Sequence, residues 1–297
     1  MPPVVLMNSG FFTEYSEIYK VLFFFLDKVI EVVEMTYMLK GRDEATRLDE
    51  QSESDHFSLE SELSGISFLP GTHLMDAGCG SGVLCRYLEK NAPDCIIHGT
   101  DLSETSLSHA RSHCLSTNTR FYKHDFLQKP FDQKYDFILN RFVAHHLNEN
   151  EFFTASRNFY ESLKPGGEIC IIDLDSLFLN LGTKNKKLLD FMERINSYFH
   201  GNLKLARLIP SILKDCGFHK ISWRIEVMDF QQKAKEDEVL QWKERFESAL
   251  DFYVSFFNRE DEARNFMKLY LDEAKREDVP LFYNKFIIRA LKHTQHT

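Results

Sequence analysis

The sequence lacks a paired-cysteine motif, and this absence bears on both metal binding and compartment. Its six cysteines stand at positions 79, 85, 95, 114, 170 and 216, with no CxxC spacing and no clustered histidines. A zinc site, or any other metal site, is therefore not expected. The apolar surroundings of most of these cysteines are typical of buried free thiols, which favours a reducing, cytoplasmic location.

Long apolar runs and basic runs are also missing. The most apolar stretch, LFFFL at 22–26, is soon interrupted by Asp27 and Lys28. A membrane-spanning helix needs about 20 nearly uncharged residues, so we expect a buried amphipathic helix and no membrane association. This helix could belong to the core or to a dimer surface, which leaves monomer and homodimer open. The net charge of -9, without a basic run, disfavours nucleic acid as a partner.

From residue 73 onward, short apolar runs alternate with longer mixed segments. This alternation predicts a Rossmann-like α/β fold, a seven-stranded and mostly parallel sheet with helices on both faces. We expect an N-terminal helical cap at 1–66, the α/β domain at 67–297 and a helical insertion at about 231–280, before the last strand. The expected strands are 73–77, 95–101, 119–125, 135–140, 168–174, 219–230 and 283–292. The expected helices are 81–92, 103–116, 149–164, 184–199, 203–216 and one or two within 234–276.

The turn after the first expected strand carries an acid and three glycines: Asp76, Gly78, Gly80 and Gly82. Glycines let the backbone approach a ligand closely. A dinucleotide site uses GxGxxG spacing, and a carboxylate would repel its pyrophosphate, so an NAD-dependent oxidoreductase is disfavoured. A carboxylate favours a nearby cation. S-adenosylmethionine fits, because it carries an ammonium, a sulfonium, a ribose and an adenine but no phosphate.

Acids also end the next two expected strands. Asp101 lies nineteen residues after Gly82, where a carboxylate can accept hydrogen bonds from a ribose diol. Asp125 could accept from an adenine amino group, and the neighbouring Phe126 could pack on the adenine ring. The spacing between Gly82 and Asp101 also occurs in NAD-binding folds. By itself it therefore does not distinguish S-adenosylmethionine from NAD.

Five segments together carry a family resemblance. MDAGCGSG, GTDLS, KHDF, YDFILNRFVAHHL and LKPGGEICIID occur in the order found in class I S-adenosylmethionine-dependent methyltransferases. The sequence resembles this family over about 60–230. The resemblance implies that the acid and glycines of the first turn frame the methionine part of the cofactor, and that Asp101 and Leu102 hold the ribose and adenine. The remaining positions that it assigns to cofactor binding are Asp125, Phe126, Asn140, Arg141 and, through its backbone, Cys79.

The charged stretch YMLKGRDEATRLDEQSESDHF is similar to the cap of many small-molecule methyltransferases in this family. This similarity implies that Tyr37 or Arg47 reaches the methionine carboxylate of the cofactor. The alternative is a plain solvated helix, because charge runs usually form exposed faces.

His145 and His146 are the candidate catalytic residues. They follow the fourth strand, near the expected position of the methyl group, and a histidine of near-neutral pKa could deprotonate a hydroxyl or an amine. Structural packing at a helix start is the alternative for either residue. Asp173 and Asp175, which end the fifth strand, are interpreted as strand-end or substrate contacts rather than as metal ligands.

The resemblance implies an enzyme that transfers a methyl group in line from S-adenosylmethionine to O, N or C of a small organic acceptor. Such a reaction needs alignment and exclusion of water more than a catalytic triad. A protein acceptor, or a non-catalytic cofactor-binding module of the same fold, are the alternatives.

Overall fold

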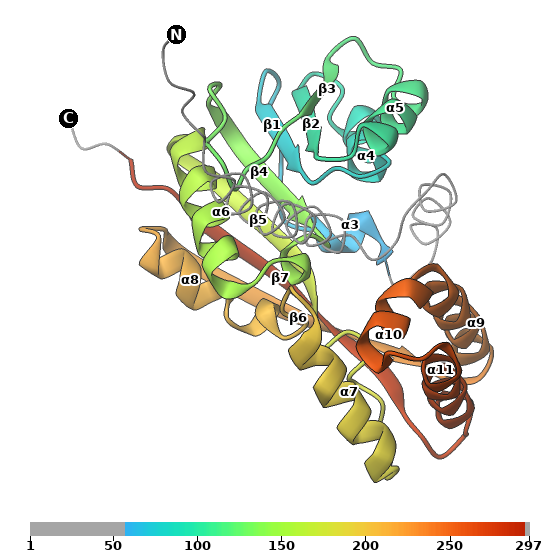
Figure 1. Ribbon diagram of the computed structural model, residues 1–297. Coiled ribbons are helices and arrows are strands. Elements are labelled where there is room, and N and C mark those ends of the chain that lie inside the picture. The colour runs from blue at the N-terminus through green and yellow to red at the C-terminus, as the bar shows by residue number, and fades with distance from the viewer. Residues whose placement is uncertain (1–56, 295–297) are drawn as a thin grey trace, which may run out of the picture. The chain divides into compact units, whose positions relative to one another are not determined.

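The computed structural model describes residues 57–294, so the predicted cap up to residue 56 lies outside the described residues, with Tyr37 and Arg47. A seven-stranded sheet organises the described part (Figure 1). Its strands in chain order are β1 (His73–Ala77), β2 (Ile96–Asp101), β3 (Thr119–Lys123), β4 (Tyr135–Arg141), β5 (Leu163–Asp175), β6 (His219–Phe230) and β7 (Leu281–Leu291).

The spatial order of the strands is β3-β2-β1-β4-β5-β7-β6. Every neighbouring pair is parallel except those of β7, which runs antiparallel to both β5 and β6. This order confirms the predicted Rossmann-like, seven-stranded and mostly parallel sheet. It also reverses beside β1, which pairs with β2 on one side and β4 on the other. In open α/β sheets such a switch point is where ligands bind, outside the carboxyl ends of the strands.

The central strands are apolar on both faces because each face carries a separate core. On one face Met75, Ile138 and Ile169 pack in a cluster with residues of the helices that follow β4 and β5. On the other face Leu74 and Leu139 pack with the helix that follows β1. Burying each such side chain contributes about 1.5–3 kcal/mol, so this double burial accounts for the near-continuous apolar runs.

Helices cover both faces of the sheet (Figure 1). They are α4 (Val83–Asn91) and α5 (Glu104–His113) near β1 to β3, α6 (Glu149–Ser162) and α8 (Ile209–Asp215) on the opposite face, and α7 (Lys186–Tyr198) after β5. A capping box starts α6: the Asn148 side chain accepts from the Glu151 backbone, and the Glu151 carboxylate accepts from the Asn148 backbone. Such a reciprocal cap fixes the start of a helix through local hydrogen bonds, without tertiary contacts.

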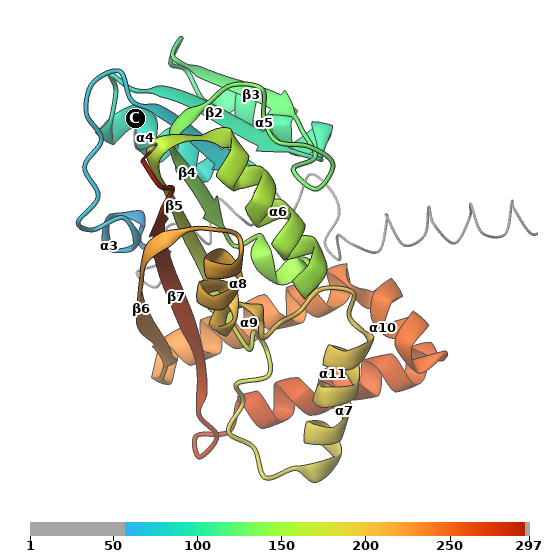
Figure 2. The ribbon, with the colours of Figure 1, turned by 90° about the vertical axis from the view of Figure 1, so that its left-hand side faces the viewer.

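Three helices, rather than the one or two expected, fill the chain between β6 and β7 in the described part. They are α9 (Gln232–Ser248), α10 (Leu250–Phe257) and α11 (Glu260–Ala274). The sequence interpretation missed the break at Asn258, whose φ of 58° ends α10 in a left-handed conformation. Phe266 of α11 packs against Phe191 of α7, so the insertion is attached to the segment that follows β5. Figure 2 shows α7 and α11 side by side.

The fifth strand begins earlier than expected. We predicted a strand from residue 168, but β5 starts at Leu163, which pairs with Tyr135. The sequence at 163–168, LKPGGE, contains proline and glycine, which favour turns. The register shifts between Tyr135 and Phe137, and Gly166 takes a φ of 77° within the strand. The turn chemistry is therefore present but forms an irregularity inside the strand. The predicted domain limits, 1–66 and 67–297, stay a prediction.

Candidate functional site

The glycine turn joins β1 to α4 at the switch point of the sheet. Gly78, Gly80 and Gly82 all have positive φ angles, of 81°, 51° and 83°, a region that favours glycine. A Cβ on Gly78 would lie 2.5 Å from Val143 Cγ2, so no side chain fits there. The backbone N–H groups of Gly78 and Cys79 donate to the Thr100 carbonyl at 2.8 Å, which ties the turn to β2.

Asp101 ends β2 and holds the turn through its carboxylate. Its Oδ2 accepts from the Gly80 N–H at 2.9 Å and its Oδ1 accepts from the Ser103 N–H at 2.8 Å. Burial raises the pKa of this carboxyl above its usual range. Each carboxylate oxygen can accept a second hydrogen bond, so the observed contacts are compatible with the predicted ribose contact. The neighbouring Leu102 is 54% exposed, which leaves its side chain available to a ligand.

Asp76 points into the protein interior at the head of the turn. It is 2% exposed, and the Cys85 thiol donates to its Oδ2 at 3.4 Å. Burial raises the pKa of Asp76 from 3.8 to about 7, while the Cys85 thiol and the Arg141 charge oppose this rise. The predicted contact between Asp76 and a ligand cation stays a prediction, because its polar partner in the described part is Cys85.

Asp125 and Phe126, predicted to hold the adenine, lie just beyond β3. Asp125 Oδ1 accepts from the Leu127 N–H at 2.9 Å, so the carboxylate shapes its own turn. The Phe126 ring lies 5.1 Å from the Phe159 ring and packs at the edge of the core beneath α6. Their adenine roles stay predictions.

Asn140 and Arg141 end β4 beside the glycine turn. The Asn140 amide donates to the Ala77 carbonyl at 2.7 Å. Its Oδ1 is buried and accepts no hydrogen bond within residues 57–294. Arg141 pairs with Glu62, with Nε 2.6 Å from Oε2. Asn140 therefore stabilises the end of β1 through its amide N–H, and its Oδ1 can accept a hydrogen bond from another donor.

The two candidate catalytic histidines differ in their surroundings. Both lie in the short 3-10 helix η2 (Ala144–His146). His145 Nδ1 lies 2.6 Å from Asp173 Oδ1, and the His145 backbone N–H donates to Asp173 Oδ2 at 2.9 Å. A carboxylate only accepts, so it favours the proton on Nδ1 and leaves Nε2 as the acceptor. This is the arrangement of an oriented general base.

His146 is deeply buried beside His145. Its ring centroid lies 4.2 Å from that of His145. Burial, and secondarily His145, lower the pKa of His146 well below its ordinary value of 6.5. Burial therefore favours the neutral form of His146, and the catalytic role of either histidine stays a prediction. The sequence interpretation left the choice between the histidines open, because the Asp173 pairing joins β5 to the end of β4 and has no sequence signature.

The sequence interpretation also missed Glu62. This residue ends α3 (Leu59–Glu62), a short helix before β1, and its carboxylate is fully buried. Besides Arg141, Lys285 of β7 lies 3.0 Å from Glu62 Oε1. No local pattern indicates this cluster, because its members come from distant parts of the chain.

The described part shows neither a metal cluster nor a membrane helix. Among residues 57–294 no group of three or more His, Cys, Asp or Glu side chains gathers as metal ligands would. No helix within the same range combines the length and apolar character that crossing a membrane requires.

Comparisons with known proteins agree with this geometry. Residues 74–167 match the model of a methyltransferase domain family. Phosphoethanolamine N-methyltransferase 3 of Arabidopsis thaliana is 26% identical over 66% of this chain. The chain spans only 38% of the length of that relative.

Two solved structures show the same fold. One is Haemonchus contortus phosphoethanolamine N-methyltransferase 2 in complex with phosphomonomethylethanolamine and S-adenosylhomocysteine, with a TM-score of 0.51 and 22% identity over 80% of this chain and 53% of that chain. The other is the YcgJ protein of Bacillus subtilis, with a TM-score of 0.54 and 16% identity over 80% of this chain and 99% of that chain. The sheet order, the glycine turn and the matched family model lead to one conclusion: this chain carries a methyltransferase domain with the class I fold.

Proposed function

We propose that this protein is an enzyme that transfers a methyl group from S-adenosylmethionine to an oxygen, nitrogen or carbon atom of a small organic molecule. The observation that carries the proposal is the glycine turn at the switch point, fastened to the end of β2 by Asp101. Relatives with small-molecule methyltransferase names support it.

The residues around the turn fit S-adenosylmethionine. Gly78 has a φ of 81° and Val143 fills the space where a Cβ would lie, so the turn keeps a backbone conformation that favours glycine. Asp101 can accept from the ribose hydroxyls, with Leu102 exposed beside it. Asn140 Oδ1 is a buried acceptor without a donor among the described residues, and an ammonium group is a suitable donor.

When bound, S-adenosylmethionine supplies an electrophilic methyl group on a sulfonium. The protein aligns the acceptor with that methyl group and removes a proton where the acceptor carries one. We assign proton removal to His145 Nε2, because Asp173 accepts from Nδ1 and orients the ring. His146, kept neutral by burial, packs against His145.

A small acceptor fits the architecture better than a polymer. The helices α9 to α11 lie between β6 and β7 in the chain, and the segment before β1 contacts both of these strands. Together they can border a site for a small molecule. The net charge of -9 gives no general affinity for phosphate backbones. The cytoplasmic location and the choice between monomer and homodimer stay predictions from the sequence.

Calorimetry with S-adenosylmethionine and S-adenosylhomocysteine tests the cofactor half of this proposal. We expect micromolar dissociation constants for both compounds and no measurable binding of NAD. Transfer of radioactive methyl groups to a panel of alkylamines, phosphobases, phenols and a protein lysate tests the acceptor half. Labelling of protein alone would contradict a small acceptor, and absence of cofactor binding would contradict the proposal as a whole.

A further inference from the structure

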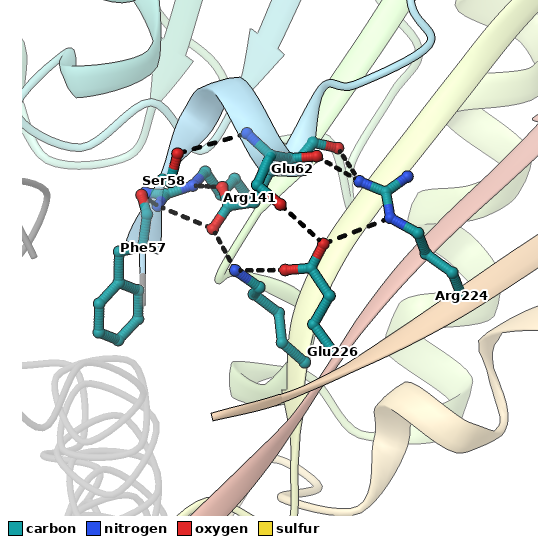
Figure 3. Close-up of polar contacts among 8 residues, drawn as sticks. Phe57, Ser58, Glu62, Arg141, Arg224 and Glu226 are labelled. Carbon is teal, nitrogen blue, oxygen red and sulfur yellow. Dashed lines mark hydrogen bonds and ion pairs between the residues drawn. The ribbon is translucent and has the colours of Figure 1, made fainter. Parts of the chain in front are cut away.

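A fully buried carboxylate joins the segment before β1 to the end of β4. Glu62 Oε2 pairs with Arg141 Nε at 2.6 Å, and Arg141 Nη2 donates to the Phe57 carbonyl at 3.1 Å. Lys285 Nζ lies 3.0 Å from Glu62 Oε1 (Figure 3 draws the cluster). A buried carboxylate between two cations is costly to desolvate and is stable only while both partners stay in place.

A second carboxylate fastens the same short helix to β6. Glu226 Oε2 also pairs with Lys285 at 3.0 Å, and Ser61 Oγ donates to Glu226 Oε1 at 3.1 Å. Arg224 donates to the Glu62 carbonyl at 2.9 Å (Figure 3). Glu226 is thus in the same charge cluster as Glu62 but makes no contact with Arg141, and its side chain is 28% exposed.

Arg141 is the member of this cluster that adjoins the cofactor turn. The residue before it, Asn140, donates to the Ala77 carbonyl at 2.7 Å. Val143, two residues after it, covers Gly78 so closely that a Cβ would lie 2.5 Å from its Cγ2. The guanidinium is also close enough for its charge to lower the pKa of Asp76. Fixing Arg141 therefore fixes the two residues that shape the start of the glycine turn.

We propose that Glu62 is a positioning residue that acts through Arg141, so that the segment Phe57–Glu62 and the glycine turn adopt their cofactor-binding geometry together. Phe57 adds an apolar contact to this coupling, because its ring meets the Phe142 ring edge-on at 5.4 Å. The inference rests on the cofactor site of the proposed function. It assigns the short helix a role in affinity for the cofactor that is separate from its role in packing.

The test compares two matched substitutions in the full chain. Glu62→Gln removes the charge that holds both Arg141 and Lys285. Glu226→Gln removes a charge that holds Lys285 and Arg224 but that no contact joins to Arg141. We expect the dissociation constant of S-adenosylhomocysteine to rise about tenfold in Glu62→Gln, within the usual range of coupling between sites, and by less than twofold in Glu226→Gln. Glu62→Asp should recover part of the loss.

Two results would overturn the inference while leaving the proposed function intact. One is a folded Glu62→Gln protein with wild-type affinity, and the other is an equal loss in both variants, which would indicate general docking of the helix. Failure of the wild type to bind S-adenosylhomocysteine would overturn the proposed function as well.

A second measurement needs no variant. Hydrogen exchange of the wild type, with and without S-adenosylhomocysteine, should show slower exchange at the amides of residues 57–63 when the ligand is bound. Unchanged exchange there, in protein shown by calorimetry to be saturated, would overturn the coupling even if Glu62→Gln failed to fold.

Discussion

Asp76→Asn should make the protein more resistant to unfolding at pH 8, although it removes an acid from the cofactor turn. The Asp76 carboxyl is buried, and burial raises its pKa from 3.8 to about 7. Because the folded-state pKa exceeds the unfolded value, the folded state binds this proton more tightly than the unfolded chain does. The contribution of Asp76 to the free energy of unfolding is therefore complete below about pH 4 and lost as the pH rises to about 7.

The magnitude follows from the size of the shift. Each pKa unit corresponds to about 1.4 kcal/mol, so the ionised carboxylate costs the folded state up to about 4 kcal/mol above pH 7. An asparagine has nearly the same shape and no charge to desolvate. The unfolding free energy of Asp76→Asn minus that of the wild type should therefore grow by about 2.3 kcal/mol between pH 5 and pH 7 and then level off.

Urea denaturation of the two proteins between pH 4 and pH 9 measures this difference. Taking the difference at each pH cancels the titration of the other carboxylates and histidines, because both proteins share them. A difference that does not vary with pH would refute the reasoning, since it would mean that Asp76 titrates alike in the folded and unfolded chains.

The same titration tests whether a ligand cation lies beside Asp76. A bound ammonium or sulfonium would lower the Asp76 pKa, so binding near pH 6.5 would release a proton and the affinity would rise with pH up to about 7. Calorimetry in buffers of different ionisation enthalpy measures the released proton. No release, with normal affinity, would show that the carboxylate acts only within the protein interior.

Three further substitutions address other parts of the site. Asp101→Ala should weaken S-adenosylhomocysteine binding by about 1–3 kcal/mol, the scale for hydrogen bonds to a charged group; calorimetry measures it, and an unchanged constant contradicts the ribose role. Asp173→Asn should lower kcat at least about tenfold, because an amide no longer favours the reactive tautomer of His145. Cofactor affinity should change by less than about twofold. A kcat equal to that of the wild type would mean that Asp173 and His145 only pack together. Gly78→Ala should destabilise the fold by about 1–3 kcal/mol more than Gly65→Ala, because both have positive φ but only Gly78 has a close neighbour; equal urea midpoints would contradict this.

Local signals predicted those elements whose limits are set locally. The β-branched and aromatic run at 219–230 coincides with β6, and the capping box of Asn148 and Glu151 starts α6. Pro165 and Gly166 mark a local backbone irregularity just as clearly, yet β5 continues through it because Leu163 pairs with Tyr135 on another strand. The sequence could not reveal that pairing, since strand length there depends on a neighbour more than 20 residues away.

The limits of sequence reasoning at the site are clearest in its two leading acids. Asp76 and Asp101 both lie at the carboxyl end of a strand on the same edge of the sheet, so their sequence contexts assign both to the ligand. Their side chains face differently: Asp101 meets the Gly80 N–H of the turn, whereas Asp76 meets the Cys85 thiol beneath α4. A position at the end of a strand predicts that a residue lies at the edge of the sheet that carries the site. The direction of its side chain depends on which of the two cores, one on each face of the sheet, it joins. For that reason Asp101 is the safer assignment to the ligand, and the pH dependence of Asp76 is the more informative measurement.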